Sequence, residues 1–308
     1  MKRSPGLLIS FALAATLLSC APHRAADHDN DAVMNDTTHR HISFEGDFDG
    51  PIGLQLWSLR EYTADNLTDA LQTARTMGFR EVELAGTYGL TPSDFRNTLA
   101  AADLKGTSMH VDHDRIRDSV DVVLDEAVAL GVEYVGLAWI PEQYRKPFTF
   151  DTARMEADYL NTWGAAAKKR GLQFFYHVHG YEFEPGPNGK TPFDVIAEET
   201  DPELVEFQMD VFWVANAGTD PVALLHRYPD RWTLMHIKDM KKGHQTGDHS
   251  GGAPAEADVA VGTGQIDYPG VLRAAKEIGV KRYYIEDEST DQLANIPQSV
   301  AFLEKVQF

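Results

Sequence analysis

The chain has 308 residues, an apolar content of 43% and a formal net charge of −19. This length could hold two domains, although α/β barrels of this size are often single domains, and the apolar fraction is ordinary for a globular protein. Because proteins that bind nucleic acid normally present a basic surface, the acidic balance argues against nucleic acid as a partner. Anionic membrane surfaces are disfavoured for the same reason.

The amino terminus is typical of an exported protein. Two basic residues at positions 2 and 3 precede an apolar stretch from Leu7 to Leu18, which is the pattern of a secretory signal peptide and is short for a membrane span. The sequence Leu17-Leu18-Ser19-Cys20 resembles a bacterial lipoprotein signal, in which the cysteine is lipidated. We therefore predict a signal peptide over residues 1–20 and a periplasmic or membrane-anchored lipoprotein. Plain secretion, with no lipid at Cys20, is the alternative.

Residues 21–46 are polar and rich in His and Asp, with no apolar period. This composition predicts a flexible tether, and we interpret its histidines as part of the tether rather than as a metal site. Cys20 is the only cysteine, so no disulfide can form within the chain and a hydrophobic core must stabilise the fold. The folded domain is predicted to span residues 47–308.

From Ile52 onward, strand and helix patterns alternate eight times. Short apolar runs predict the strands, and apolar residues at helical spacing predict the helices, with Gly or Pro near their ends. The expected strands cover residues 52–57, 81–84, 106–110, 134–139, 174–179, 207–210, 233–236 and 283–286. The expected helices cover residues 65–77, 91–102, 118–130, 151–170, 192–199, 220–227, 268–278 and 297–306.

Strands that are separated by helices throughout form a parallel sheet. Eight such units over this length predict a closed (β/α)8 TIM barrel in a single domain. An open, doubly wound sheet is the alternative, but no Gly-rich dinucleotide turn follows the first strand. The segment 241–264 is Gly-rich and aperiodic, which is typical of a lid over an active site. A disordered insertion is the alternative for this segment.

Four polar side chains stand at the ends of four successive predicted strands, namely His177, Asp210, His236 and Glu286. In a barrel of parallel strands these ends meet at one rim, where active sites lie. Two imidazoles and two carboxylates suit Mn, Co, Fe or Zn better than Ca. The sequence therefore predicts one divalent metal ion at this rim.

Six segments, in this order along the chain, resemble the sugar phosphate isomerase/epimerase family of xylose isomerase-like TIM barrels. They are GLQLWS at 53–58, VELAG at 82–86, YHVHGYEF at 176–183, MDVFW at 209–213, HIKDM at 236–240 and IED at 285–287. In that family, residues from strands five to eight bind one divalent metal, which implies the same four ligands here. The chain departs from many relatives at His177, where they carry a Glu that is both ligand and base. It departs from some at Trp213, where they carry a His.

Isomerisation, epimerisation and elimination of sugars share a first step, in which a base removes a proton from the carbon next to a carbonyl. A divalent metal stabilises the enediolate that results. Glu286 is expected to act as this base, although a carboxylate bound to metal has a low pKa. His179, His110 and Glu83 are candidates for the second proton-carrying group. Glu83 alternates with apolar neighbours, which points it into the barrel, where an unpaired carboxylate is costly.

Six further residues are expected to contact the substrate, because they lie at or near strand ends. Aromatic faces suit the apolar side of a sugar ring, and polar groups suit its hydroxyls. Five of them have a structural alternative: ordinary packing for the three tryptophans, a satisfied structural role for the histidine and a surface salt bridge for the lysine. The six are Gln55, Trp57, His110, Trp139, Trp213 and Lys238.

The sequence favours a metal-dependent isomerase or epimerase of a non-phosphorylated carbohydrate. Export makes a phosphorylated metabolite an unsuitable substrate, and no Gly-rich phosphate loop is present. The first alternative is a lyase that eliminates from 3-keto-glycosides, since the family also includes inosose dehydratases and deglycosidases of this kind. The second is a non-catalytic sugar-binding lipoprotein, against which the retention of all four ligand types argues. The expected partner is a small carbohydrate, and the membrane is reached only through a lipid at Cys20.

Overall fold

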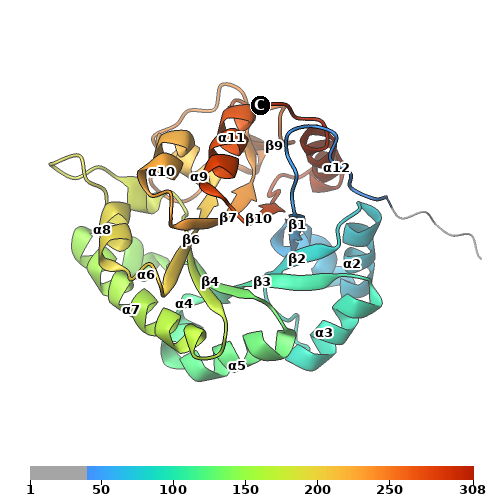
Figure 1. Ribbon diagram of the computed structural model, residues 1–308, viewed down its shortest axis with the longest axis horizontal. Coiled ribbons are helices and arrows are strands. Elements are labelled where there is room, and N and C mark those ends of the chain that lie inside the picture. Colours follow the sequence, from blue (N-terminus) through green and yellow to red (C-terminus); the bar gives the residue numbers. More distant parts are fainter. Residues whose placement is uncertain (1–39) are drawn as a thin grey trace, which may run out of the picture. The chain divides into compact units, whose positions relative to one another are not determined.

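The computed structural model describes residues 40–308. Eight parallel strands close into a barrel, and the helices form an outer ring around it (Figure 1). This arrangement confirms the predicted TIM barrel. The strands follow one another around the barrel in the order β1, β10, β7, β6, β5, β4, β3, β2. Their bounds are β1 Ile52–Gln55, β2 Glu81–Leu84, β3 Lys105–Asp112, β4 Tyr134–Trp139, β5 Gln173–His177, β6 Val205–Asp210, β7 Trp232–Ile237 and β10 Arg282–Ile285.

The longer helices lie close to their predicted places, and short helices that the sequence did not predict accompany them at the ends of β1, β3, β4 and β6. The helices are α1 Arg60–Asp65, α2 Leu67–Thr76, α3 Pro92–Ala101, α4 His113–Asp118, α5 Val120–Leu130, α6 Glu142–Arg145, α7 Phe150–Lys168, α8 Pro192–Glu199, α9 Val211–Asn216, α10 Pro221–Arg227, α11 Tyr268–Ile278 and α12 Gln292–Leu303.

Several predicted boundaries differ from the observed ones by two residues or more, among them the end of β1 at Gln55, and two of the differences matter here. The strand expected to reach His179 ends at His177, because the backbone N–H of His179 donates to the carboxylate of Glu182 (2.8 Å) and Gly180 turns the chain with a φ of 97°. The last helix begins at Gln292, so the proline at 297 lies within the helix and does not start it. The first difference moves His179 from a strand into a loop.

Local signals account for several helix ends that agree with prediction. Thr191 and Asp194 form a capping box at the start of α8, in which each side chain accepts a backbone N–H at the other position. Gly131 and Gly279 end α5 and α11 in the left-handed conformation, which glycine adopts without a Cβ clash. These ends are decided within a few residues: the capping box ends the loop between β5 and α8, and the two glycines begin the short turns that lead into β4 and β10.

An apolar layer fills the inside of the barrel. It contains Tyr134, Phe175, Leu234 and Tyr284. Gly136 makes room for this layer, because a Cβ at this position would lie 2.3 Å from a carbon of the Phe175 ring.

Polar side chains follow this layer toward the carboxyl ends of the strands. Alternate residues of a strand face the same side. His177, His236 and Glu286 stand two positions after Phe175, Leu234 and Tyr284 respectively, so they are the next residues that face the inside of the barrel. The apolar layer is thus the base on which the polar residues of the rim stand.

Residues 40–48 pack against the carboxyl-terminal segment. The N–H groups of Glu45 and Gly46 donate to the carbonyl of Glu304 (2.7 and 3.1 Å), and Arg40 pairs with the Glu304 carboxylate (2.6 Å). Contacts with the barrel therefore begin before residue 47, within the segment predicted as a tether. The predicted signal over residues 1–20 and most of that tether lie outside the described residues. In the described part, none of the helices has the length and apolar character that a membrane crossing requires.

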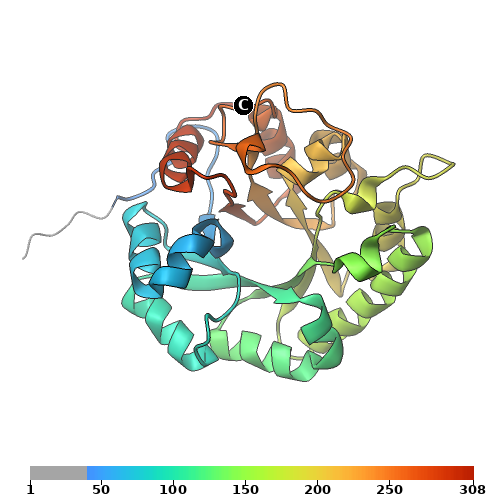
Figure 2. The same ribbon diagram turned by 180° about the vertical axis from the view of Figure 1, so that it is seen from behind.

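The long segment after β7 is folded against the barrel. Two short antiparallel strands, β8 Asp239–Met240 and β9 Asp258–Val259, close it into a loop. The carboxylate of Asp239 accepts the N–H groups of Gly262 and Gly264 (2.9 Å each). Figure 2 shows the loop in orange beside the barrel opening. Its residues 251–255 line the main cavity, as expected for a lid.

Candidate metal centre

The structure brings the four predicted ligands together at the carboxyl end of the barrel. Oδ2 of Asp210 lies 4.0 Å from Nε2 of His177 and 3.7 Å from Nδ1 of His236. The same Nδ1 lies 3.2 Å from Oε2 of Glu286. Ligand atoms of Asp210, His236 and Glu286 therefore lie within 4.8 Å of one another, and Nε2 of His177 approaches the same Asp210 oxygen from β5.

The surroundings of Asp210 fit a bound cation. Its Oδ1 accepts the backbone N–H of Trp213 at 2.9 Å, whereas Oδ2 is buried and has no hydrogen-bond partner among residues 40–308. A buried carboxylate oxygen without a partner costs free energy, unless a cation or a donor satisfies it. This oxygen points at both imidazoles, so a divalent metal with mixed nitrogen and oxygen ligands suits the place.

Gln208 and Glu83 each contact one nitrogen of a ligand imidazole and leave the other nitrogen free to face Asp210. Nδ1 of His177 lies 2.8 Å from Oε1 of Gln208, and Nε2 of His236 lies 2.5 Å from Oε1 of Glu83. When these nitrogens carry the protons, Nε2 of His177 and Nδ1 of His236 hold lone pairs that face Asp210. Such partners orient metal ligands and raise their basicity.

Glu83 lies beneath the cavity and does not line it. Its carboxylate is fully buried and accepts hydrogen bonds from Gln55, Ser108 and Gln208 (2.7, 2.6 and 2.8 Å) as well as from His236. Burial acts to raise the pKa of Glu83, but His110 and His236 lower it to about 2. This placement does not favour the predicted catalytic role, because the oxygens are occupied and out of a substrate's reach. Glu83 instead positions His236.

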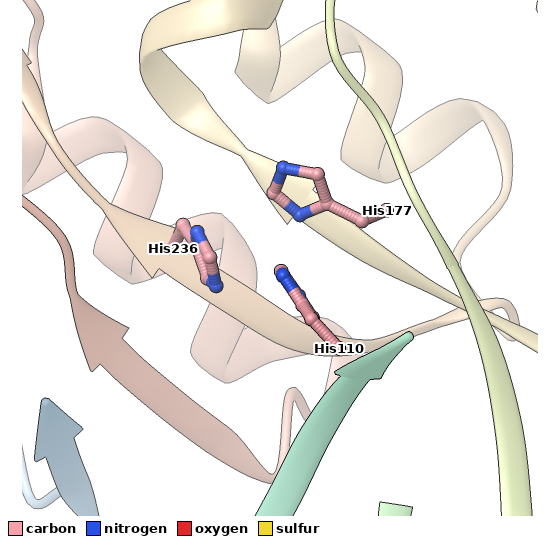
Figure 3. A group of neighbouring side chains, drawn as sticks. All are labelled: His110, His177 and His236. Atoms are coloured by element: carbon pink, nitrogen blue, oxygen red, sulfur yellow. The ribbon is translucent and has the colours of Figure 1, made fainter. Parts of the chain in front are cut away.

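His110 stands between this buried network and the cavity. Figure 3 shows the imidazoles of His110, His177 and His236 facing one another from β3, β5 and β7, and the three can place nitrogens within 4.8 Å of one another. Nε2 of His110 lies 2.7 Å from Oε1 of Gln208, and its ring stacks on His236 at 5.3 Å. These contacts give it a satisfied structural position, while its exposed edge still lines the cavity.

The cavity above the cluster has a volume of about 740 Å³. Most of the predicted substrate-binding and catalytic residues line it, whereas Asp210, His236 and Glu83 lie below its floor. The predicted residues in its wall are Gln55, Trp57, His110, Trp139, His177, His179, Trp213, Lys238 and Glu286. The prediction missed Arg60, Phe212, Asp258 and Glu288, which also line the wall.

His179 lies in the cavity wall beside the metal-facing rings. Its imidazole stacks on Trp213 (4.7 Å) and meets Trp139 edge-on (4.4 Å), and its centroid is 5.6 Å from that of His177. Within the described part of the chain, its buried Nδ1 has no hydrogen-bond partner. Burial lowers the pKa of His179, and the nearby Lys238 lowers it further, so the ring stays neutral.

Lys238 is buried, so the alternative of a surface salt bridge is wrong. Its Nζ forms a close ion pair with Glu288 and lies 3.6 Å from Oε2 of Glu286. It also lies 5.1 Å from the centre of the Trp213 ring, the ring on which His179 stacks. Burial acts to raise the pKa of Glu286, but Lys238 and His236 hold it well below its ordinary value. Glu286 is therefore ionised, which suits a metal ligand, and its role as the base stays a prediction.

Comparison with known proteins agrees with this geometry. The family model of the xylose isomerase-like TIM barrel matches residues 71–306. The chain belongs to this family.

Several curated proteins and solved structures are similar to this chain. The chain is 27% identical over 150 residues to an inosose dehydratase of Lacticaseibacillus casei, covering 47% of this chain and 49% of that protein; it thus spans about half the length of this curated relative. A sugar phosphate isomerase/epimerase structure from Parabacteroides distasonis superposes with a TM-score of 0.67 at 23% identity, over 89% of this chain and 97% of the other. The structure of an IolI protein with a bound zinc atom superposes with a TM-score of 0.61 at 17% identity, over 82% and 95%. At these identities, the two superpositions show the fold.

The metal centre can be tested by replacing one carboxylate with the neutral amide of the same size. We expect Asp210→Asn to weaken binding of Mn²⁺ or Zn²⁺ by at least about 100-fold, because it replaces the unpaired oxygen's carboxylate with a neutral amide. Glu83→Gln should weaken binding by about 10- to 100-fold, because it loosens His236. The measurement is isothermal titration calorimetry on protein stripped of metal with a chelator.

Glu156→Gln is the matched control, since Glu156 is a buried carboxylate 3.1 Å from Nε2 of His113 but does not line the cavity. Its metal affinity should stay within about twofold of the unmodified protein. If Asp210→Asn and Glu156→Gln bound metal equally well, the centre would lie elsewhere.

Glu182, whose carboxyl group accepts the backbone N–H of His179, gives a prediction for the pH dependence of folding stability. Burial raises the pKa of Glu182 from 4.5 to about 7, despite opposing backbone hydrogen bonds, among them that from His179. Between these values the folded chain keeps a proton that the unfolded chain has lost, so folding stability should fall as pH rises from 5 to 8. Glu182→Gln should remove this fall in folding stability, which amounts to about 3 kcal/mol. Urea unfolding at pH 5 and pH 8 measures it.

Glu184→Gln serves as the control in this experiment, because Glu184 lies two residues away and is exposed. It should leave the pH dependence of unfolding unchanged. Equal pH dependence in Glu182→Gln and the unmodified protein would show that the buried carboxyl does not carry the shift.

Proposed function

We propose that this protein is a divalent-metal-dependent lyase that acts on the keto form of a polyhydroxylated ring. It would remove an oxygen substituent from the carbon β to the carbonyl. The observation that carries the proposal is that two groups able to move protons both lie against the Trp213 ring: the His179 imidazole, whose Nδ1 has no partner within residues 40–308, and the buried Lys238 ammonium. Elimination needs one group to take a proton and another to give one, and both stand at the rim of the metal centre.

His177, Asp210, His236 and Glu286 would hold the metal. A bound divalent ion supplies Lewis-acid stabilisation of negative charge on the carbonyl oxygen. We propose Mn, Fe, Co or Zn, because the ligand set mixes imidazole and carboxylate. The zinc atom in the IolI protein supports a metal of this kind.

In the proposed reaction, the imidazole of His179 takes the proton from the carbon next to the carbonyl. The electron pair of that C–H bond forms the new carbon–carbon double bond, and the bond from the β carbon to its oxygen substituent breaks. Nζ of Lys238 protonates the departing oxygen, which leaves as water or as an alcohol. The products are an unsaturated ketone and the released hydroxyl compound. Aromatic rings around His179 exclude water from the proton transfer.

The charge of the wall favours a non-phosphorylated substrate. The cations that line the cavity are Arg60 and Lys238, and Lys238 is already paired with Glu288. Apart from the metal centre, the wall therefore offers little positive charge to a phosphate dianion, and an uncharged keto substrate suits the cavity better.

Elimination is preferred over the isomerisation or epimerisation that the sequence first suggested. Epimerisation by two carboxylates needs one on each face of the substrate, and the position where relatives carry a carboxylate base holds His177. The name of the Lacticaseibacillus casei relative, an inosose dehydratase, supports a lyase. Export, a lipid at Cys20 and the signal over residues 1–20 concern residues outside the described part of the chain and stay predictions.

NMR spectroscopy in D₂O tests the proposed function. The metal-loaded protein is given a keto-inositol and a methyl 3-keto-glucoside in turn, and the reaction is quenched with chelator. We expect loss of water or of methanol, with an unsaturated ketone as the other product. Deuterium next to the carbonyl with every carbon–oxygen bond intact would instead identify an isomerase or epimerase. No change in either compound would support the alternative of a binding protein.

Substitutions test the proposed roles of His179 as the base and Lys238 as the proton donor. His179→Ala should lower kcat by about 100-fold or more, and Lys238→Met should do the same for compounds with a poor leaving group. His226→Ala is the control, because His226 is an exposed histidine that pairs with Glu277 and does not line the cavity. Full turnover by His179→Ala with metal still bound would remove His179 from the mechanism.

A further inference from the structure

We propose that the mouth of the cavity holds a second subsite, built from Trp57, Arg60 and Glu288, that binds the ring of the leaving group. The substrate would then be an oxidised glycoside with two rings, a sugar and a ring-bearing aglycone, rather than a single keto sugar or keto cyclitol. This inference rests on the proposed function for its chemistry, but the binding subsite can be tested separately.

The size of the cavity is the first reason. A single hexose occupies about 200 Å³ at the packing density of organic crystals. The cavity measures about 740 Å³, which leaves room for a second ring after one ring fills the part next to the metal centre. Sites usually enclose most of their ligand's surface, so a single ring would be enclosed poorly here.

Trp57 is the second reason, because it is a large aromatic side chain exposed at the mouth and held in place. It is 46% exposed and lines the cavity. Its Nε1 donates to Oε1 of Glu288 at 3.1 Å. The Arg60 guanidinium lies 5.6 Å from the ring centre and donates to the carbonyls of Trp57 and Glu288 (3.2 Å each). An immobilised indole that keeps an open face suits stacking with a ring, at little cost in conformational entropy.

Trp57 also lies on the correct side of the cavity. It follows β1, and β5 stands opposite β1 in the strand order of the barrel. His177 and His179 come from the end of β5, where Trp139 and Trp213 form the inner aromatic wall. A ligand with one ring against that wall would extend toward Trp57 across the mouth.

Glu288 connects the outer platform to the proton donor. One carboxylate oxygen accepts the Trp57 indole N–H, and the other is paired with Nζ of Lys238. In the proposed reaction, Lys238 protonates the departing oxygen. The group attached to that oxygen therefore lies beside Trp57, which is why the outer ring is assigned to the leaving group.

Binding of unreactive glucosides tests the subsite without any turnover. Calorimetry on the metal-loaded protein would compare methyl β-D-glucoside with 4-nitrophenyl β-D-glucoside and with cellobiose. We expect at least one of the two-ring compounds to bind about tenfold more tightly than the methyl compound, and Trp57→Ala to abolish this preference. Which of the two gains affinity distinguishes an aromatic aglycone from a second sugar. Tyr62→Ala, an exposed aromatic outside the cavity wall, should keep the preference.

Three results would overturn the inference: no preference in the unmodified protein, a preference that survives Trp57→Ala, or no binding of any glucoside. The proposed chemistry fails independently, through the NMR assay with keto compounds. Loss of preference in Trp57→Ala together with no elimination would leave the subsite standing and reject the lyase. Elimination from keto-inositol without any preference for two-ring compounds would support the lyase and reject the subsite.

Discussion

One buried carboxylate, that of Glu83, ties the floor of the site together. Its four hydrogen-bond donors are Gln55, Ser108, Gln208 and His236, which come from β1, β3, β6 and β7 while Glu83 itself lies on β2. A single anion thus links five of the eight strands. An ionised group in this position would be costly without partners, and the ring of donors keeps it charged.

The position of the metal-facing atoms follows from this floor. Glu83 takes one nitrogen of His236, and Gln208 takes one nitrogen of His177, so the opposite nitrogens face Asp210. Oδ2 of Asp210 has no hydrogen-bond partner within residues 40–308, and Glu286 lies beside the same imidazole of His236. A divalent cation held here would satisfy both carboxylates, which would connect metal binding to the stability of the rim.

The cavity is organised in two parts by the same arrangement. Residues at the ends of β4, β5 and β6 provide an inner wall of aromatic rings around His179, and Lys238 reaches between the metal centre and Glu288. Residues that follow β1 and β10 provide the outer rim with Trp57. Because β1 and β10 are neighbours in the closed barrel, Trp57 and Glu288 meet although 231 positions separate them in the chain. The lid from the β7 loop covers the remaining side.

The sequence alone determined the barrel and the four candidate metal ligands. Strand and helix periods are local, and the end of a parallel strand points to one rim of the barrel, so His177, Asp210, His236 and Glu286 could be grouped without coordinates. Gln208 could have been found in the same way, since it precedes Asp210 by two positions and faces the same side.

Only the tertiary structure decided the roles of the residues around those ligands. The sequence placed Glu83 inside the barrel, but its donors come from four other strands, so its place below the cavity depends on barrel closure. His179 lies in the cavity wall because the Glu182 side chain ends β5 early. The pairing of Trp57 with Glu288 joins the first strand to the last. Such contacts depend on which distant segments become neighbours, and local periodicity carries no information about that.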